Sequence, residues 1–349
     1  MGQTARRAAI ATLVALSIVV AALALWKIKI VIALLFLGFT IAAAMRPGVE
    51  WLAARRVPRG VGVLLHYVVV VGLIAVFLWL VVPVARTQVE QAIGKATSQS
   101  QLKHSHGVKH TFLVAVQKRL KNVPTGGAVI HTAINATKKA FEILIGIFFV
   151  FAVAAYWIFE RDKAVDLVAS LIDRPKRKKV RDTWWLIDQK LGAFVRGEVI
   201  LIIFVAALLS FAFWLDGLPY WLLVGVFAGV FEIVPVIGPL VAGALAIGIG
   251  LTVDWKTALG AGIAVLVLRQ LEDYIVVPRV LGHAVGLSPL VVLVSVTTIG
   301  FLLGGFYVLL AIPIASLLAT LVDVVLRDKD PAEEDVPTVL FPAKDAETG

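Results

Sequence analysis

Apolar runs with few or no charged residues recur along the whole chain, and most are long enough to cross a bilayer. They cover residues 8–26, 30–45, 61–85, 143–159, 199–215, 217–253, 257–277 and 284–322. A spanning helix needs about 20 predominantly apolar residues. Two of the runs are too long for one span and carry prolines and glycines near the middle, so each predicts two helical segments that meet at a break. The pattern predicts an all-α polytopic membrane protein with about 8–10 transmembrane or re-entrant helices.

Composition supports this class and excludes several functions. Of the 349 residues, 60% are apolar and 16% are charged, whereas soluble domains average about 45–50% and about 25%. The chain has no cysteine, which excludes disulfides, thiolate nucleophiles, iron–sulfur clusters and cysteine-ligated zinc. The net charge is +10. In so apolar a chain, the basic residues are better explained by their role in orienting the protein toward the anionic cytoplasmic leaflet than by nucleic-acid binding. We therefore expect the lipid bilayer, and no nucleic acid, as a partner.

Lysine and arginine are unevenly distributed between the two sides that these spans define. With a cytoplasmic N-terminus, 21 of the 33 Lys and Arg residues lie on the cytoplasmic side. Outside, 3 lie in short loops and 9 in the long segment 84–140, where the positive-inside rule weakens. The asymmetry predicts that both termini and residues 161–197 are cytoplasmic.

Changes in composition divide the chain into four regions. We expect three N-terminal transmembrane helices in residues 1–85, an extracytoplasmic amphipathic insertion in 86–140 and a core transport domain in 141–326. The core domain includes the cytoplasmic amphipathic segment 161–197, where apolar residues recur at helical spacing before the next span. Residues 327–349 are acidic with too few apolar residues to pack, so we expect a disordered tail.

Glu232 is the most isolated charge within the apolar runs. It lies three positions before Pro235, in a segment that also contains Gly238 and Pro239. A carboxylate at bilayer depth costs on the order of 3 kcal/mol, so it is a functional candidate. A helix broken at these prolines leaves backbone carbonyls that are tolerated where they line a polar cavity. These groups predict a substrate, cation or proton site; alternatively, Glu232 lies near the cytoplasmic interface and is simply hydrated.

Three further charges, Arg269, Glu272 and Asp273, interrupt the run at 257–277. Their spacing of i, i+3 and i+4 places them on one face of a helix, where they can partly neutralise one another. We expect this net-acidic face to line a translocation path and to join Glu232 in the substrate or ion site. The alternative is a self-paired patch at a helix end.

Motifs of the common enzyme classes are absent. The sequence contains no His-Glu-x-x-His, no Gly-x-Ser-x-Gly and no Walker motif. His104, His106 and His110 resemble metal spacing, but Gly107 interrupts the helix that would align them, and neighbouring lysines disfavour a bound cation. We therefore expect no enzymatic activity, no cofactor and no metal. Without an ATP site, any active transport must use an ion gradient.

Several ordered segments of the second half resemble one transporter family. They are Leu-Ile-Asp-Gln-Lys-Leu-Gly-Ala-Phe-Val-Arg-Gly-Glu at 186–198, Ile-Val-Pro-Val-Ile-Gly-Pro at 233–239, Glu-Asp-Tyr-Ile-Val-Val-Pro-Arg-Val-Leu-Gly from 272, Gly-Leu-Ser-Pro-Leu-Val-Val at 286–292, and Gly304-Gly305 through Ala-Ile-Pro-Ile at 311–314. Together these segments resemble the AI-2E family transporters. Two positions depart from the family pattern, since Ser288 stands where His is common and Glu198 stands where Gln is usual.

The resemblance implies a bacterial inner-membrane secondary transporter that forms homo-oligomers. The family takes its name from export of autoinducer-2, and some relatives are described as sodium/proton antiporters. The motif positions expected to shape the fold are Arg196, Gly197, Pro278, Gly282, Gly286, Pro289 and Pro313. We expect export of a small polar organic solute, similar to autoinducer-2, driven by a proton or sodium gradient. The alternatives are a sodium (or other cation)/proton antiporter and, from another class, a non-transporting membrane scaffold or an intramembrane enzyme.

Overall fold

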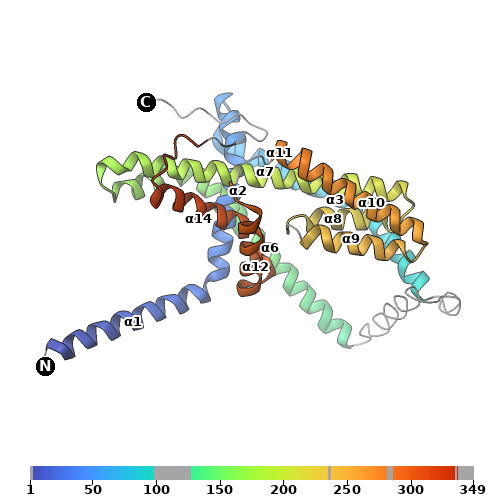
Figure 1. The fold of residues 1–349 in the computed structure, drawn as a ribbon, viewed down its shortest axis with the longest axis horizontal. Coiled ribbons are helices and arrows are strands. Elements are labelled where there is room, and N and C mark those ends of the chain that lie inside the picture. Colours follow the sequence, from blue (N-terminus) through green and yellow to red (C-terminus); the bar gives the residue numbers. More distant parts are fainter. Residues whose placement is uncertain (1–2, 98–126, 235–236, 281–285, 335, 337–349) are drawn as a thin grey trace.

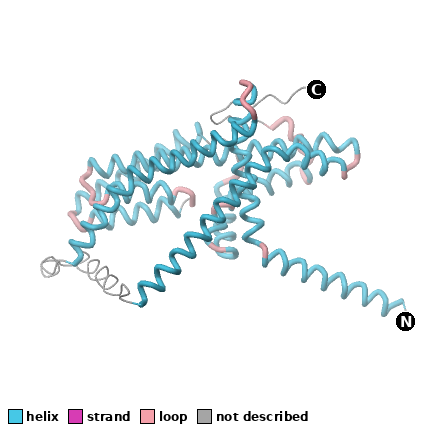
Figure 2. Tube along the Cα trace, turned by 180° about the vertical axis from the view of Figure 1, so that it is seen from behind, coloured by secondary structure: helices cyan, strands magenta, loops and turns pink. Residues whose placement is uncertain are grey.

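The computed structural model describes residues 3–97, 127–234, 237–280, 286–334 and 336. Within these ranges the regular structure is helical and no strand occurs (Figure 2). Every apolar run identified in the sequence contains at least one helix. The predicted class, an all-α membrane protein, is therefore confirmed. The central part of the predicted insertion, including His104, His106 and His110, lies outside the described residues.

In the described part of the chain, five helices are long and apolar enough to cross a membrane. They are α1 (Gln3–Lys27), α2 (Lys29–Ala54), α3 (Arg59–Thr97), α6 (Gly127–Ser170) and α7 (Arg177–Leu215). Helix α1 extends away from the rest of the molecule, and α2 packs against α3, α6 and α7 (Figure 1). Large apolar side chains such as Trp79 and Phe148 are exposed on these helices, as expected for surfaces that face hydrocarbon.

The two longest apolar runs each fold into a pair of short helices. The first pair is α8 (Trp221–Phe231) and α9 (Ile237–Gly250); the second is α12 (Pro289–Leu303) and α14 (Ala311–Val325), joined through α13 (Gly305–Val308). Helix α8 has 11 residues and α9 has 14. They therefore extend about 16 Å and about 21 Å, against a hydrocarbon core about 30 Å thick. Neither spans a bilayer alone, so the first run forms a hairpin of half-length helices.

Helix α7 connects the two halves of the molecule. It is one unbroken helix of 39 residues, preceded by the short 3₁₀ turn η1 (Arg174–Lys176). One part of α7 packs against α2 and α14, and another part packs against α8 (Figure 1). Its inner face supplies Val205, Leu209 and Phe213 to an apolar core shared with α8 and α9. Of the predicted amphipathic segment 161–197, residues 177–197 thus continue into the next span as a single helix, whereas residues 161–170 form the end of α6.

Helix α10 (Trp255–Leu271) leads directly into an irregular helical segment. Asp254 caps its start, because the carboxylate accepts a hydrogen bond from the Thr257 N–H at 2.7 Å. This hydrogen bond lowers the pKa of Asp254 below its ordinary value. After α10, the chain forms the π-helix η2 (Glu272–Val276) and the single turn α11 (Val277–Val280). The π-helix holds two of the predicted site residues.

Helices α2 and α7 touch at the level of their backbones. Pro47, within α2, has no N–H, so it cannot donate to the carbonyl of Ala43 as an ordinary helical residue would. Gly192 of α7 faces this carbonyl so closely that a Cβ at position 192 would lie 2.5 Å from the Ala43 oxygen. One turn further along α7, Arg196 Nη1 donates a hydrogen bond to the Ala44 carbonyl at 3.0 Å. Only glycine fits at this crossing.

The four regions proposed from composition, 1–85, 86–140, 141–326 and 327–349, stay predictions. The described part of the last region, residues 327–334 and 336, contacts α7 and α14. Residues 337–349 lie outside the described part of the chain.

Candidate functional site

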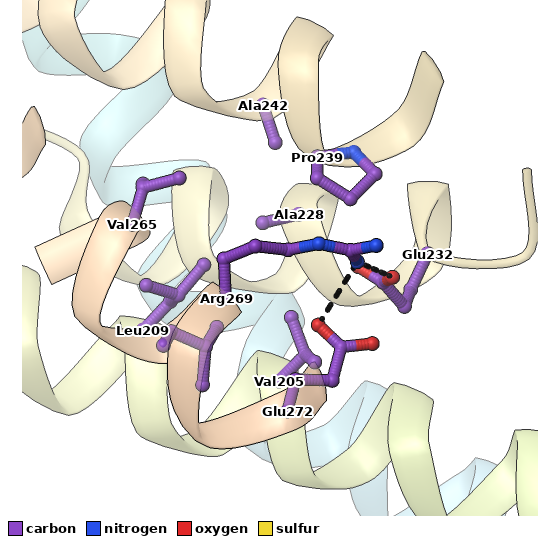
Figure 3. Close-up of a pocket in the computed structure, with 10 residues that line it drawn as sticks. Val205, Leu209, Ala228, Glu232, Pro239, Ala242, Val265, Arg269 and Glu272 are labelled. Atoms are coloured by element: carbon purple, nitrogen blue, oxygen red, sulfur yellow. Dashed lines mark hydrogen bonds and ion pairs between the residues drawn. The ribbon is translucent and has the colours of Figure 1, made fainter. Parts of the chain in front are cut away.

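The predicted site residues Glu232, Arg269, Glu272 and Asp273 come together from the end of α8, from α10 and from η2. Figure 3 shows the first three of them. We call these four residues the acidic site. Glu232 follows directly after the last residue of α8, and Arg269 lies in the last turn of α10. Glu272 begins the π-helix. The structure thus joins the isolated carboxylate with the charged face, as the sequence analysis expected.

A single guanidinium contacts all three carboxylates of the acidic site. Arg269 Nη1 lies 3.4 Å from Glu232 Oε1 and 3.3 Å from Glu272 Oε2, while Nη2 lies 3.3 Å from Asp273 Oδ1. The Glu232 and Glu272 side chains are 7% and 4% exposed, so both are withdrawn from water. Three carboxylates against one cation leave an excess of negative charge. Burying such an excess is costly, and a bound proton would reduce the cost.

Glu198 of α7 adds a further carboxylate that the sequence analysis did not place in the site. Its side chain is half-buried, and its charge repels those of Glu232 and Glu272. In the sequence, Glu198 stands out only as a departure from the family pattern. The position after Arg-Gly was the available signal, but a linear sequence does not show that α7 passes beside η2.

A small cavity lies against the acidic site. Its volume is about 10 Å³, which is room for about one water molecule. Its walls come from Val205 and Leu209 of α7, Ala228 of α8, Pro239 and Ala242 of α9 and, on α10, Val265 and Leu268; Glu232, Arg269 and Glu272 also line it (Figure 3). The charged groups therefore meet beside a small, otherwise apolar space. In this conformation the cavity has no room for an organic solute.

The break between α8 and α9 forms one edge of the site. Gly238, in the first turn of α9, packs on the end of α8, where a Cβ would lie 1.9 Å from the Phe231 oxygen. Pro239 lines the cavity. Pro235 lies outside the described residues, so its predicted role at the break stays a prediction.

The remaining motif residues lie outside the acidic site. Pro289 begins α12 behind the N-cap Ser288, Pro313 is buried in α14, and Pro278 lies in α11. Gly286 has a φ of +61°, a conformation that favours glycine. Arg196 and Gly197 are buried in α7. Gly282 lies outside the described residues. Among the described residues, no cluster of three or more metal-binding side chains occurs.

A second ionic cluster, which sequence analysis did not predict, joins α2, α6 and α7. Its members, here called the cytoplasmic network because the distribution of Lys and Arg predicts that side for them, are Arg46, Glu50, Arg161, Asp162 and Asp188. The shortest contacts are Arg46 Nε to Glu50 Oε1 at 2.5 Å and Arg161 Nε to Asp188 Oδ2 at 2.7 Å. Two guanidinium groups are shared among three carboxylates.

Long apolar helices, hairpins of half-length helices and a buried ion cluster at a helix break define a multi-pass membrane protein of the transporter class. A family model described as "AI-2E family transporter" matches residues 13–327, and the chain belongs to this family. The resemblance noted in the sequence is therefore confirmed, together with the assignment to the bacterial inner membrane.

Individual relatives agree with this assignment. YrrI, a proposed transport protein of Bacillus subtilis, is 26% identical over 310 residues, covering 86% of this chain and 88% of that protein. YueF, a second proposed transport protein of B. subtilis, is 23% identical over 286 residues, covering 75% of this chain and 76% of that protein. PerM, a proposed permease of Escherichia coli K12, is 24% identical over 211 residues, covering 60% of each chain. The protein is thus a membrane transporter of the permease type, consistent with the expectation of a non-enzymatic function.

Proposed function

We propose that the protein is a proton-coupled secondary transporter in which Glu232 and Glu272 bind the coupling proton. The observation that carries this proposal is the sharing of one guanidinium, that of Arg269, by three carboxylates beside a small apolar cavity. Two of these carboxylates are buried, so the site holds more negative charge than the protein neutralises. Proton binding from one side and release to the other would couple the proton gradient to movement of the half-length helices.

A proton fits this site better than a sodium ion. A dehydrated cation needs about six oxygen ligands around one point. Arg269 Nη1 occupies the place between the carboxylates of Glu232 and Glu272, where such a cation would bind. Sodium binding would require the guanidinium to leave, whereas a proton needs only one carboxylate oxygen. The position of Arg269 thus supports proton coupling.

For the transported species, we propose export of a small polar organic solute, which the family match supports. Such a solute would enter only after the α8–α9 hairpin separates from α10 and enlarges the cavity. Cation/proton antiport is the second candidate, and the size of the cavity favours it, because space for about one water suits a small ion better than an organic molecule. Self-association into homo-oligomers also stays a proposal.

The test is proton flux in proteoliposomes that contain the purified protein and a trapped pH-sensitive dye. With an imposed pH gradient, the wild type should move protons, and Glu232→Gln should abolish or uncouple this flux at unchanged expression and oligomer size. Glu160→Gln is a matched control, because Glu160 is an exposed carboxylate of α6 paired with Lys163. Wild-type flux in Glu232→Gln would contradict the assignment of Glu232.

Additional conditions separate the candidates. Sodium-dependent proton movement in the absence of any organic solute, lost in Glu232→Gln, would favour the antiporter. A wild-type protein that moves neither protons nor organic solute would favour a membrane scaffold.

A further inference from the structure

The chain after α14 folds back onto the start of α7. We call residues 327–334 together with Val336 the C-terminal segment. At its beginning, Arg327 and Lys329 pair with Asp323 of α14 at 2.9 Å and 2.7 Å. Asp328 then pairs with Lys179, near the start of α7. These ion pairs set the direction in which the segment leaves α14.

Lys190 of α7 is the main attachment point of the C-terminal segment. Its Nζ lies 2.6 Å from Glu334 Oε1 and donates a hydrogen bond to Thr320 Oγ1 of α14 at 3.2 Å. The Lys190 side chain is 6% exposed. A buried ammonium requires a counter-charge, and Glu334 supplies it. One side chain of α7 therefore holds both α14 and the C-terminal segment.

Apolar contacts accompany these ion pairs. Pro331 is fully buried, and Val336 packs against Ala193, which is 0% exposed. A disordered, fully solvated segment would make no such contacts. Ionic and apolar contacts thus both dock the C-terminal segment on α7.

The part of α7 under the C-terminal segment also contacts the groups that surround the transport site. Gly192 meets the backbone of α2. Phe194 packs in a cluster with Val234, the last described residue before the α8–α9 break. Glu198 interacts electrostatically with Glu232 and Glu272. Any movement of this stretch relative to α14 would have to break the Lys190–Thr320 hydrogen bond, and the C-terminal segment, which links α14 to Lys190 through Glu334, opposes such a movement.

We propose that the C-terminal segment is an autoinhibitory latch that holds α14 against α7 while the cavity at the acidic site is closed. A contact made in one conformation stabilises that conformation, so the latch opposes the opening that transport requires. Release of the segment therefore raises the transport rate. The flux measurement below rests on the proposed proton coupling, whereas the labelling measurement does not depend on it.

The test compares Glu334→Gln with Glu333→Gln, because Glu333 is an exposed neighbouring carboxylate. Both changes are made in the Cys-free chain carrying Ala193→Cys, a position that Val336 covers. In inside-out vesicles, reaction with a membrane-impermeant maleimide should accelerate roughly tenfold or more in Glu334→Gln, since a charge-assisted contact is lost. Proton flux should rise in the same variant. Glu333→Gln should match the parent in both measurements.

Equal labelling rates in Glu334→Gln and its parent would overturn the docking. Faster labelling without a rise in flux would overturn the inhibitory role. The exchanged pair Lys190→Glu with Glu334→Lys should restore parental labelling and flux, which shows that the ion pair, and not a folding defect, causes the effect. Failure of the proposed function would appear differently, as absent flux in the parent with the labelling difference intact.

Discussion

The acidic site and the cytoplasmic network contain similar residues but differ in their balance of charge. In the acidic site, one guanidinium faces three carboxylates, and its contacts measure 3.3 Å to 3.4 Å. In the cytoplasmic network, two guanidinium groups face three carboxylates, with contacts as short as 2.5 Å and 2.7 Å. The better balanced cluster with shorter contacts is suited to fastening helices together. The less balanced cluster can take up a positive charge, which is the property that coupling requires.

The largest expected effect concerns the side of the membrane on which the cytoplasmic network lies. Labelling from that side should be all-or-none. A single cysteine at Lys178→Cys, in the first turn of α7, should be labelled by an impermeant maleimide only after the cytoplasmic side is opened. The reason is the distribution of lysine and arginine between the two sides. Labelling from outside intact cells would reverse the orientation and remove the network from the cytoplasm.

The next largest effect is on stability, in the cytoplasmic network. Asp188→Asn leaves the buried guanidinium of Arg161 without its closest carboxylate, since both side chains are about one-tenth exposed. Loss of one member of a buried pair costs about 3–5 kcal/mol of unfolding free energy. Thermal unfolding in detergent should show this loss, while Glu232→Gln unfolds near the wild-type temperature. Equal unfolding temperatures for Asp188→Asn and the wild type would remove the distinction between the clusters.

A smaller effect is expected when the cation of the acidic site, Arg269, is removed, and this effect is on transport. Arg269→Gln removes the charge that three carboxylates share, so bound protons should be released less readily. Because a charge-assisted hydrogen bond contributes about 1.5–3 kcal/mol, proton flux should fall roughly tenfold or more. Arg279→Gln, a change in an arginine that does not line the cavity, serves as the control. Unchanged flux in Arg269→Gln would show that the guanidinium does not act on the coupling proton.

The smallest effect is expected at Asp254, a charge outside both clusters. Its pKa is lowered in the folded protein from an ordinary value of 3.8, so its cap stabilises the fold above that pH and the contribution is lost as pH falls through the lowered value. Asp254→Asn keeps a side-chain acceptor but does not titrate. As the pH is lowered from 6, the thermal unfolding temperature of Asp254→Asn should therefore fall slightly less steeply than that of the wild type. Parallel curves would contradict this.

Much of the architecture was predictable because it follows from hydrophobic periodicity. The apolar runs located the helices, and their length marked the intervals that form paired short helices. The cost of burying charge identified Glu232, Arg269 and Glu272 without any knowledge of their partners. These predictions depend on local composition, which a linear sequence contains.

Other features depend on tertiary contacts and were not predictable. The π-helix at Glu272–Val276 lies in a run that reads as ordinary α-helix, although π-helical turns often occur at functional sites. Glu198 joins the acidic site because α7 passes beside η2. The cytoplasmic network pairs Arg161 with Asp188 across two helices. No spacing rule within one segment relates such residues.

The continuity of α7 has a mechanical consequence. Its 39 residues make a rod about 58 Å long, and the backbone contact with α2 at Gly192 divides the rod into unequal arms. The arm toward Arg177 is about 23 Å long and the arm toward Leu215 about 35 Å. In a rigid rotation about this contact, a displacement of the Arg177 end is magnified about 1.5-fold at the Leu215 end, and a tilt of about 10° moves the Leu215 end by about 6 Å, roughly one helical turn. A small movement near Lys179 would thus produce a larger movement at the end of α7 that leads into the α8–α9 hairpin.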